Sequence, residues 1–166
     1  SGSISHTGKT AICLVSHGNH RIGIDVEPFI PATEVDEIKK FILTDFECNY
    51  IETTDNEKSQ WTTILFSAKE CLFKALYPEV NFYFDFLDAE VANIDLRTSQ
   101  MEFRLRKSLT EDLPTGSSFR IHWMIKEDVV TYTPTYSATN GHTSTGQIDN
   151  LLQSTYLEGH SSDRMI

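Results

Sequence analysis

The chain has 166 residues, of which 39% are hydrophobic and 11% aromatic. This length and composition predict a single globular domain with a sizeable core, and they exclude a disordered or fibrous chain. The formal net charge of −10 argues against nucleic acid or an anionic membrane as the main partner.

The cysteines and the hydropathy of the chain indicate a cellular location. Cys13, Cys48 and Cys71 form no CxxC pair and leave an odd count, so a disulfide framework and a zinc ribbon are not expected, and a reducing cytoplasm fits best. The sequence contains no signal peptide and no apolar run of membrane-spanning length. It also lacks an initiator methionine, and we expect a fragment or a processed chain.

The first predicted elements are two strands. Residues 9–16 (KTAICLVS) and 21–27 (RIGIDVE) have strand character and are separated by the Gly-Asn turn of residues 17–20. We therefore predict a β-hairpin over residues 9–27. The preceding segment, residues 2–7 (GSISHT), is interpreted as a loop.

Three helices follow in the prediction, over residues 33–41, 43–51 and 58–76. Thr44 and Asp45 are candidates to cap the second helix, and Pro78 is expected to stop the third. The apolar stripe of the third helix predicts that it is largely buried; its members are Trp61, Leu65, Ala68, Leu72 and Leu76.

The second half of the chain is predicted to be strands. Residues 89–96, 101–109 and 118–126 alternate between apolar and polar side chains, and residues 129–133 form a fourth candidate. The predicted fold is α+β, with an antiparallel sheet packed against helices. Residues 1–133 are expected to form this domain, and the polar residues 134–166 a flexible C-terminal tail.

Acidic side chains gather in two places that could carry chemistry. Asp25 and Glu27 lie on the same face of a predicted strand, and Glu70 and Lys74 lie one turn apart on the third helix. One interpretation of the helix pair is a surface ion pair. The other is that Glu70 meets Asp25 and Glu27 across the fold. Three converging carboxylates need a cation, and oxygen ligands favour magnesium, manganese or calcium.

The segment GSISHT offers a second kind of site. A loop with hydroxyls, backbone N–H groups and the imidazole of His6 suits a phosphate group. The other histidines show no ligand spacing, and the sequence contains no P-loop, GxGxxG or Ser-His-Asp pattern.

Taken in order, GSISHT, IGIDVE and FSAKECLFKAL resemble the phosphopantetheinyl transferase family, of the larger kind that serves surfactin and enterobactin synthetases. The resemblance covers residues 2 to about 132. It implies transfer of the 4'-phosphopantetheine arm of coenzyme A to a serine of an apo acyl or peptidyl carrier protein, with release of adenosine 3',5'-bisphosphate.

The resemblance also implies a role for each matched residue. Asp25, Glu27 and Glu70 would hold Mg2+, and Glu70 would help to deprotonate the carrier serine. Lys74 would stabilise the charge on the phosphate oxygens. The matched residues expected to contact coenzyme A are Ser5, His6, Lys69 and Lys74.

The chain departs from the family at both ends. The larger transferases consist of two similar lobes, and most of the N-terminal lobe has no counterpart here, so that lobe is expected in cis or in trans. After residue 133 the sequence turns polar where the family is apolar. The carrier is expected to dock on a local apolar patch, formed by Phe41, Phe46, Tyr50 and Ile51, unless these side chains belong to the core.

The hypothesis is therefore a Mg2+-dependent 4'-phosphopantetheinyl transferase, or the catalytic lobe of one. The alternative is a non-catalytic half-enzyme or a binding domain for carrier protein or coenzyme A. A third interpretation, two unrelated surface acid clusters, fails if Asp25 and Glu70 are neighbours in the fold.

Overall fold

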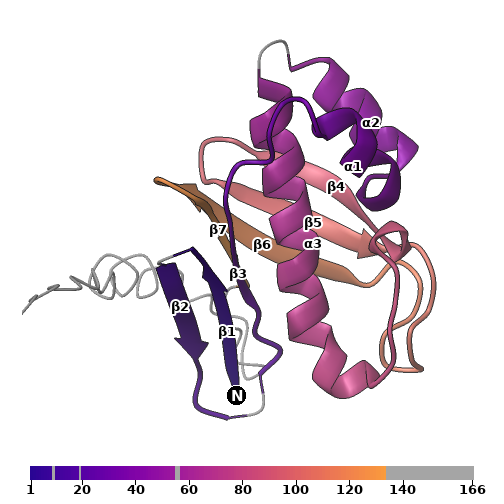
Figure 1. The fold of residues 1–166 in the computed structure, drawn as a ribbon. Helices are drawn as coiled ribbons and strands as arrows, with labels where there is room; N and C mark the ends of the chain where they lie inside the picture. Colours follow the sequence, from indigo (N-terminus) through magenta and orange to yellow (C-terminus); the bar gives the residue numbers. More distant parts are fainter. Residues whose placement is uncertain (9, 19, 55–56, 134–166) are drawn as a thin grey trace, which may run out of the picture.

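The computed structural model describes residues 1–8, 10–18, 20–54 and 57–133. They form an α+β fold, as predicted, with a five-stranded antiparallel sheet in the order β3-β7-β6-β5-β4. The strands of this sheet are β3 (Ile24–Glu27), β4 (Ala89–Asp95), β5 (Gln100–Leu105), β6 (Ser118–Ile125) and β7 (Val129–Tyr132). Figure 1 shows a long helix lying across one face of this sheet.

That helix is α3 (Lys58–Val80), and its predicted apolar stripe is confirmed. All five side chains of the stripe are at most 5% exposed and lie in the main core. They pack against alternate residues of the sheet, including Met101, Phe103 and Ile121. The helix continues past Pro78 and ends at Asn81, which has a left-handed φ of 55°. The predicted stop at Pro78 is therefore wrong, because a residue in the left-handed region ends the helix instead.

Two short helices cover the N-terminal half of α3 (Figure 1). They are α1 (Val35–Ile42) and α2 (Asp45–Glu52). The predicted cap of α2 is confirmed, since the Thr44 hydroxyl accepts from the Glu47 backbone and Glu47 accepts from the Thr44 backbone. This reciprocal capping box fixes the start of α2 and turns Glu47 into the core.

The predicted hairpin over residues 9–27 is wrong. The hairpin is formed by β1 (Gly2–Thr7) and β2 (Thr10–Val15), so GSISHT is a strand and not a loop. β3 pairs with β7, more than 100 residues later in the chain. The local turn signal at residues 17–20 was outweighed by this long-range pairing, in which Ile24 and Val26 share a small core with Val130 and Tyr132.

The β1–β2 hairpin lies against the edge of β3 (Figure 1). Ser3 and Ser5 point toward β3, and their hydroxyls accept hydrogen bonds from the backbone N–H groups of Ile24 and Val26. Side chains thus satisfy donors that would otherwise be open on an edge strand. Ile12 and Leu14 share this inner face and pack on the small core of Ile24 and its neighbours.

Gly23 sets how closely β3 approaches α3. A Cβ atom at this position would lie 2.0 Å from the backbone oxygen of Cys71 and 3.1 Å from the backbone nitrogen of Ala75. Only glycine allows the two backbones to come so near. This close approach brings the next inward-facing residue of the strand, Asp25, against the middle of α3.

The remaining predicted strands are confirmed, with β5 ending earlier than expected, at Leu105. The predicted tail at residues 134–166 lies outside the described residues. Within the part of the chain that the structure describes, no helix is long and apolar enough to cross a membrane.

Candidate functional site

The site is built around Asp25, whose side chain is buried between β3 and α3. Its Oδ1 atom accepts hydrogen bonds from the Lys74 ammonium at 2.6 Å and from the Ser5 hydroxyl at 2.9 Å. Its Oδ2 atom accepts from the Ser67 hydroxyl at 2.8 Å. A buried carboxylate with this many donors is held in a fixed orientation.

Glu27 and Glu70 lie beside Asp25, and both are only partly buried. Burial, followed by the negative charges of Asp25 and Glu70, raises the pKa of Glu27 to about 7, although Lys74 opposes the shift. Burial and then the charge of Asp25 also raise the pKa of Glu70. The three carboxylates are therefore neighbours across the fold, and two unrelated acid clusters are excluded.

This donor set suits a hard divalent cation, because Mg2+ prefers carboxylate oxygens and a bound cation would offset the crowded negative charge. Asp25, Glu27 and Glu70 are the residues that could hold it. In the conformation that the described residues adopt, however, no three His, Cys, Asp or Glu side chains are arranged around one ion position. The Lys74 ammonium instead supplies the positive charge beside Asp25.

Ser5 and His6 point in opposite directions, because successive side chains of a strand alternate between its faces. The Ser5 hydroxyl is buried and holds Asp25, and it accepts from the Lys74 ammonium at 3.0 Å. His6 is exposed on the outer face of the hairpin, opposite Ala11. The structure thus brings Ser5 into the carboxylate site and does not bring Ser5 and His6 together on one phosphate position.

Lys69 lies on the other side of α3 and points into the protein. Its ammonium donates to Glu47 at 2.7 Å and to the backbone oxygens of Ile42 and Phe86 at 2.8 and 2.9 Å. These three bonds use all its donors, and burial lowers its pKa. Glu47 also accepts from the Val91 backbone. Lys69 therefore joins α3 to the end of α1, to α2 and to the segment before β4, a position that does not support the expected contact with coenzyme A.

Two contributors to the site were missed at the level of the sequence. Neither Ser67 on α3 nor Thr131 on β7 was among the site residues that the sequence predicted. The Thr131 hydroxyl donates to the Ser67 backbone oxygen at 2.9 Å. Ser67 could have been predicted from its helical spacing, because it precedes Glu70 by three residues and Lys74 by seven. For Thr131 no local signal exists, because its place depends on the pairing of β7 with β3.

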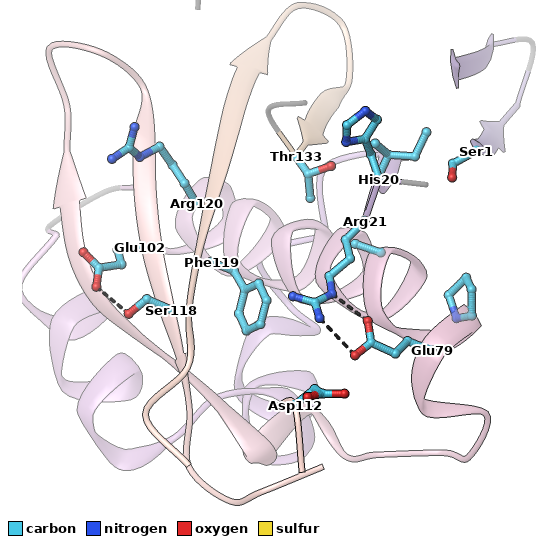
Figure 2. Close-up of a pocket in the computed structure, with 13 residues that line it drawn as sticks. Ser1, His20, Arg21, Glu79, Glu102, Asp112, Ser118, Phe119, Arg120 and Thr133 are labelled. Atoms are coloured by element: carbon cyan, nitrogen blue, oxygen red, sulfur yellow. Dashed lines mark hydrogen bonds and ion pairs between the residues drawn. The ribbon is translucent and has the colours of Figure 1, made fainter. Parts of the chain in front are cut away.

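A separate cavity of about 890 Å³ lies at the C-terminal end of α3, away from these carboxylates. Figure 2 shows Phe119 and the ion pair between Arg21 and Glu79 among the residues that line it. Its acidic and basic side chains are mixed, and none of Asp25, Glu27 and Glu70 lines it. Size alone therefore does not make this cavity the reactive site.

Comparisons with known proteins agree with the geometry. A sequence profile of the 4'-phosphopantetheinyl transferase superfamily matches residues 21–115. Enterobactin synthase component D of Escherichia coli O157:H7 is 33% identical over 129 residues, which cover 78% of this chain and 55% of that protein. The protein of the same name from Salmonella typhi is 30% identical over 79 residues, covering 48% of this chain and 33% of that protein.

Among solved structures, the holo-[acyl-carrier-protein] synthase of Thermotoga maritima superposes with a TM-score of 0.52 at 19% identity, covering 70% of this chain and 62% of that chain. At that identity the likeness speaks for the fold alone. The chain spans about half the length of the curated relatives it matches. The match of the profile over residues 21–115, together with the convergence of β3 and α3, leads to one conclusion: the chain belongs to the 4'-phosphopantetheinyl transferase superfamily.

Proposed function

We propose that this chain is the catalytic lobe of a 4'-phosphopantetheinyl transferase that modifies an apo carrier protein of a siderophore-type peptide synthetase. The observation that carries the proposal is the convergence of Asp25 and Glu27 from β3 with Glu70 and Lys74 from α3. A domain that only binds a partner has no need for three adjacent carboxylates and a lysine in one half-buried site. The three free cysteines support a cytoplasmic location.

In the proposed reaction, the serine oxygen of the carrier attacks the coenzyme A phosphorus that bears pantetheine. The bond from this phosphorus to the bridging oxygen breaks, and adenosine 3',5'-bisphosphate leaves. Glu70 accepts the serine proton, directly or through water, and burial and then the charge of Asp25 raise its pKa, which makes it a stronger base than an ordinary glutamate. The protonated Lys74 stabilises the charge on the bridging and leaving oxygens.

Asp25, Glu27 and Glu70 are proposed to bind Mg2+, which would neutralise the pyrophosphate when bound. The raised pKa of Glu27 supports this assignment, because burial and then the charges of Asp25 and Glu70 disfavour its ionised form, and a bound cation would offset both effects. Ser5 and Ser67 act on Asp25 and fix its orientation. His6 is retained as a proposed contact for a coenzyme A phosphate from the exposed face of the hairpin.

One observation favours a second candidate, a half-enzyme that requires a further lobe. The outer face of the β1–β2 hairpin is apolar, and Ile4 and Val15 on it are 67% and 72% exposed. Large apolar side chains exposed together on a hairpin mark a surface that another element covers. We propose that a second lobe, in cis or in trans, packs there and completes the coenzyme A site.

The test is intact-mass analysis of an apo carrier protein incubated with this chain, coenzyme A and Mg2+, against an EDTA control. A Mg2+-dependent gain of one phosphopantetheine is the expected result. If the folded chain gives no gain until a separately produced N-terminal lobe is added, the half-enzyme is correct. If no gain occurs under either condition although coenzyme A or carrier binds, the chain is a binding domain and the transferase proposal fails.

A further inference from the structure

Aromatic side chains gather beside the proposed reactive site, at the C-terminal end of α3. The Phe73 ring contacts the rings of Tyr77, Tyr83 and Phe84, with centroids 5.2, 5.8 and 4.9 Å away. Phe84 is 5% exposed and anchors the group in the core, whereas Tyr77 and Tyr83 are 45% and 70% exposed. Phe73, Tyr77 and Tyr83 are called the aromatic patch below.

The aromatic patch is continuous with the reactive groups. Phe73 follows Glu70 by three residues, and Tyr77 follows Lys74 by three. Helix residues with this spacing are surface neighbours, with Cβ atoms about 5–6 Å apart. The patch and the two proposed catalytic side chains therefore share one face of α3.

The dimensions of the patch point to a macromolecule rather than a small ligand. The cavity beside Phe73, which Phe84 also lines, has a volume of only about 10 Å³, far below the several hundred Å³ of a typical small-molecule pocket. Exposed tyrosines supported by buried aromatics are typical of protein interfaces, because they bury a large rigid area at low entropic cost.

The position of the aromatic patch beside Glu70 indicates which macromolecule binds it. The attacking serine belongs to a folded carrier protein and must come within hydrogen-bond distance of Glu70. The carrier surface around that serine must then cover the next two turns of α3, which hold Phe73 and then Tyr77, about 10.5 Å along the helix axis from Glu70. We propose that the aromatic patch is the docking surface for the carrier protein, whose apolar side chains beside the modified serine pack on Tyr77 and Tyr83. This inference rests on the proposed function.

The test uses the apo carrier domain of a siderophore peptide synthetase, with its reactive serine replaced by alanine and a fluorescent label attached. Anisotropy measures its binding to wild-type protein and to the double variant Tyr77→Ser/Tyr83→Ser. We expect the variant to bind about 10- to 30-fold more weakly, as loss of interface hot spots does. The KM for unmodified carrier rises by the same factor, while the Kd for coenzyme A stays within twofold.

Two controls accompany the double variant. Leu96→Ser removes a side chain that is 64% exposed. Leu96 directly follows the C-terminal end of β4, about 23 Å along that strand from Ala89. We expect this variant to leave carrier binding unchanged. Tyr77→Phe/Tyr83→Phe keeps the rings and retains most of the affinity. Circular dichroism confirms that each variant is folded.

Equal carrier binding by wild type and the double serine variant overturns the docking surface, whether or not transfer occurs. A weaker affinity for coenzyme A with unchanged carrier binding also overturns it, because the patch would then hold the pantetheine arm. If wild type binds the carrier through the patch but transfers nothing even when an N-terminal lobe is added, the docking surface stands and the proposed function fails. If wild type binds no carrier, both fail.

Discussion

Replacing Gly23 with alanine tests how the close approach of β3 to α3 builds the site. The new Cβ atom would lie 2.0 Å from the Cys71 oxygen, whereas a tolerable contact needs about 3.0 Å or more. The strand must therefore withdraw by about 1 Å, the difference between these two distances. The atom that it meets belongs to the backbone of a buried helix and cannot turn aside.

The withdrawal acts directly on Asp25. Its hydrogen bonds to Lys74 and Ser67 are 2.6 and 2.8 Å long, and a shift of about 1 Å stretches both beyond the normal range of about 2.7–3.2 Å. Overpacking costs about 1–3 kcal/mol and a weakened bond to a charged group about 1.5 kcal/mol or more. We expect the free energy of unfolding to fall by about 2–4 kcal/mol, and the Tm by about 6–12 °C.

Urea unfolding and thermal melting measure the stability of Gly23→Ala, and the intact-mass assay measures its transfer rate. Gly2→Ala is the matched control, because a Cβ atom at Gly2 meets nothing closer than 3.8 Å, and its stability stays within about 0.5 kcal/mol of wild type. A Gly23→Ala protein as stable and as active as wild type would refute the claim that this contact positions Asp25.

Three further predictions concern single side chains. Glu70→Gln keeps the fold but lowers transfer by at least about 100-fold, as loss of a general base does; turnover like that of wild type in the intact-mass assay would contradict its role. Without divalent ions, the Tm rises when the pH is lowered from 8 to 6. The reason is that Glu27 loses its proton above about pH 4.5 in the unfolded chain but only above about pH 7 in the folded chain, so protonation between these values stabilises the folded state. Glu27→Gln reduces this pH dependence, and an unchanged slope would count against the assigned shift. Lys69→Met lowers the free energy of unfolding by about 3–5 kcal/mol, because it leaves Glu47 buried without its cation. The Kd for coenzyme A, measured by calorimetry, stays within twofold. Loss of coenzyme A affinity in a variant that remains folded would instead place Lys69 in the ligand site.

Local periodicity was sufficient to predict much of the fold and part of the site. The 3.6-residue period of α3 and the alternation of the later strands were sufficient to predict these elements. Each of them buries one continuous apolar face, and that face is visible in the sequence without knowledge of its packing partner. The same periodicities put Asp25 and Glu27 on one face of β3, and Glu70 and Lys74 on one face of α3. The meeting of these two faces was a hypothesis, supported by the resemblance to a known family.

The roles of Ser5, His6 and Lys69 needed the tertiary structure. Ser5 and Lys69 were grouped with the ligand contacts, yet Ser5 holds Asp25 and Lys69 holds Glu47 inside the core. A sequence motif records which residues occur together, but a one-residue step along a strand or helix changes the direction of the side chain.

The sequence by itself determined the helices and the later strands, the shared face of Asp25 with Glu27 and of Glu70 with Lys74, and the family. Only the tertiary structure decided that β1 pairs with β2, that β3 pairs with β7, and that the Lys74 ammonium reaches Asp25. The physical reason is that periodicity depends on residues a few positions apart in the chain. The pairing partner of a strand depends instead on distant residues, because burial of their apolar side chains must outweigh the entropy lost in closing the loop between the two strands.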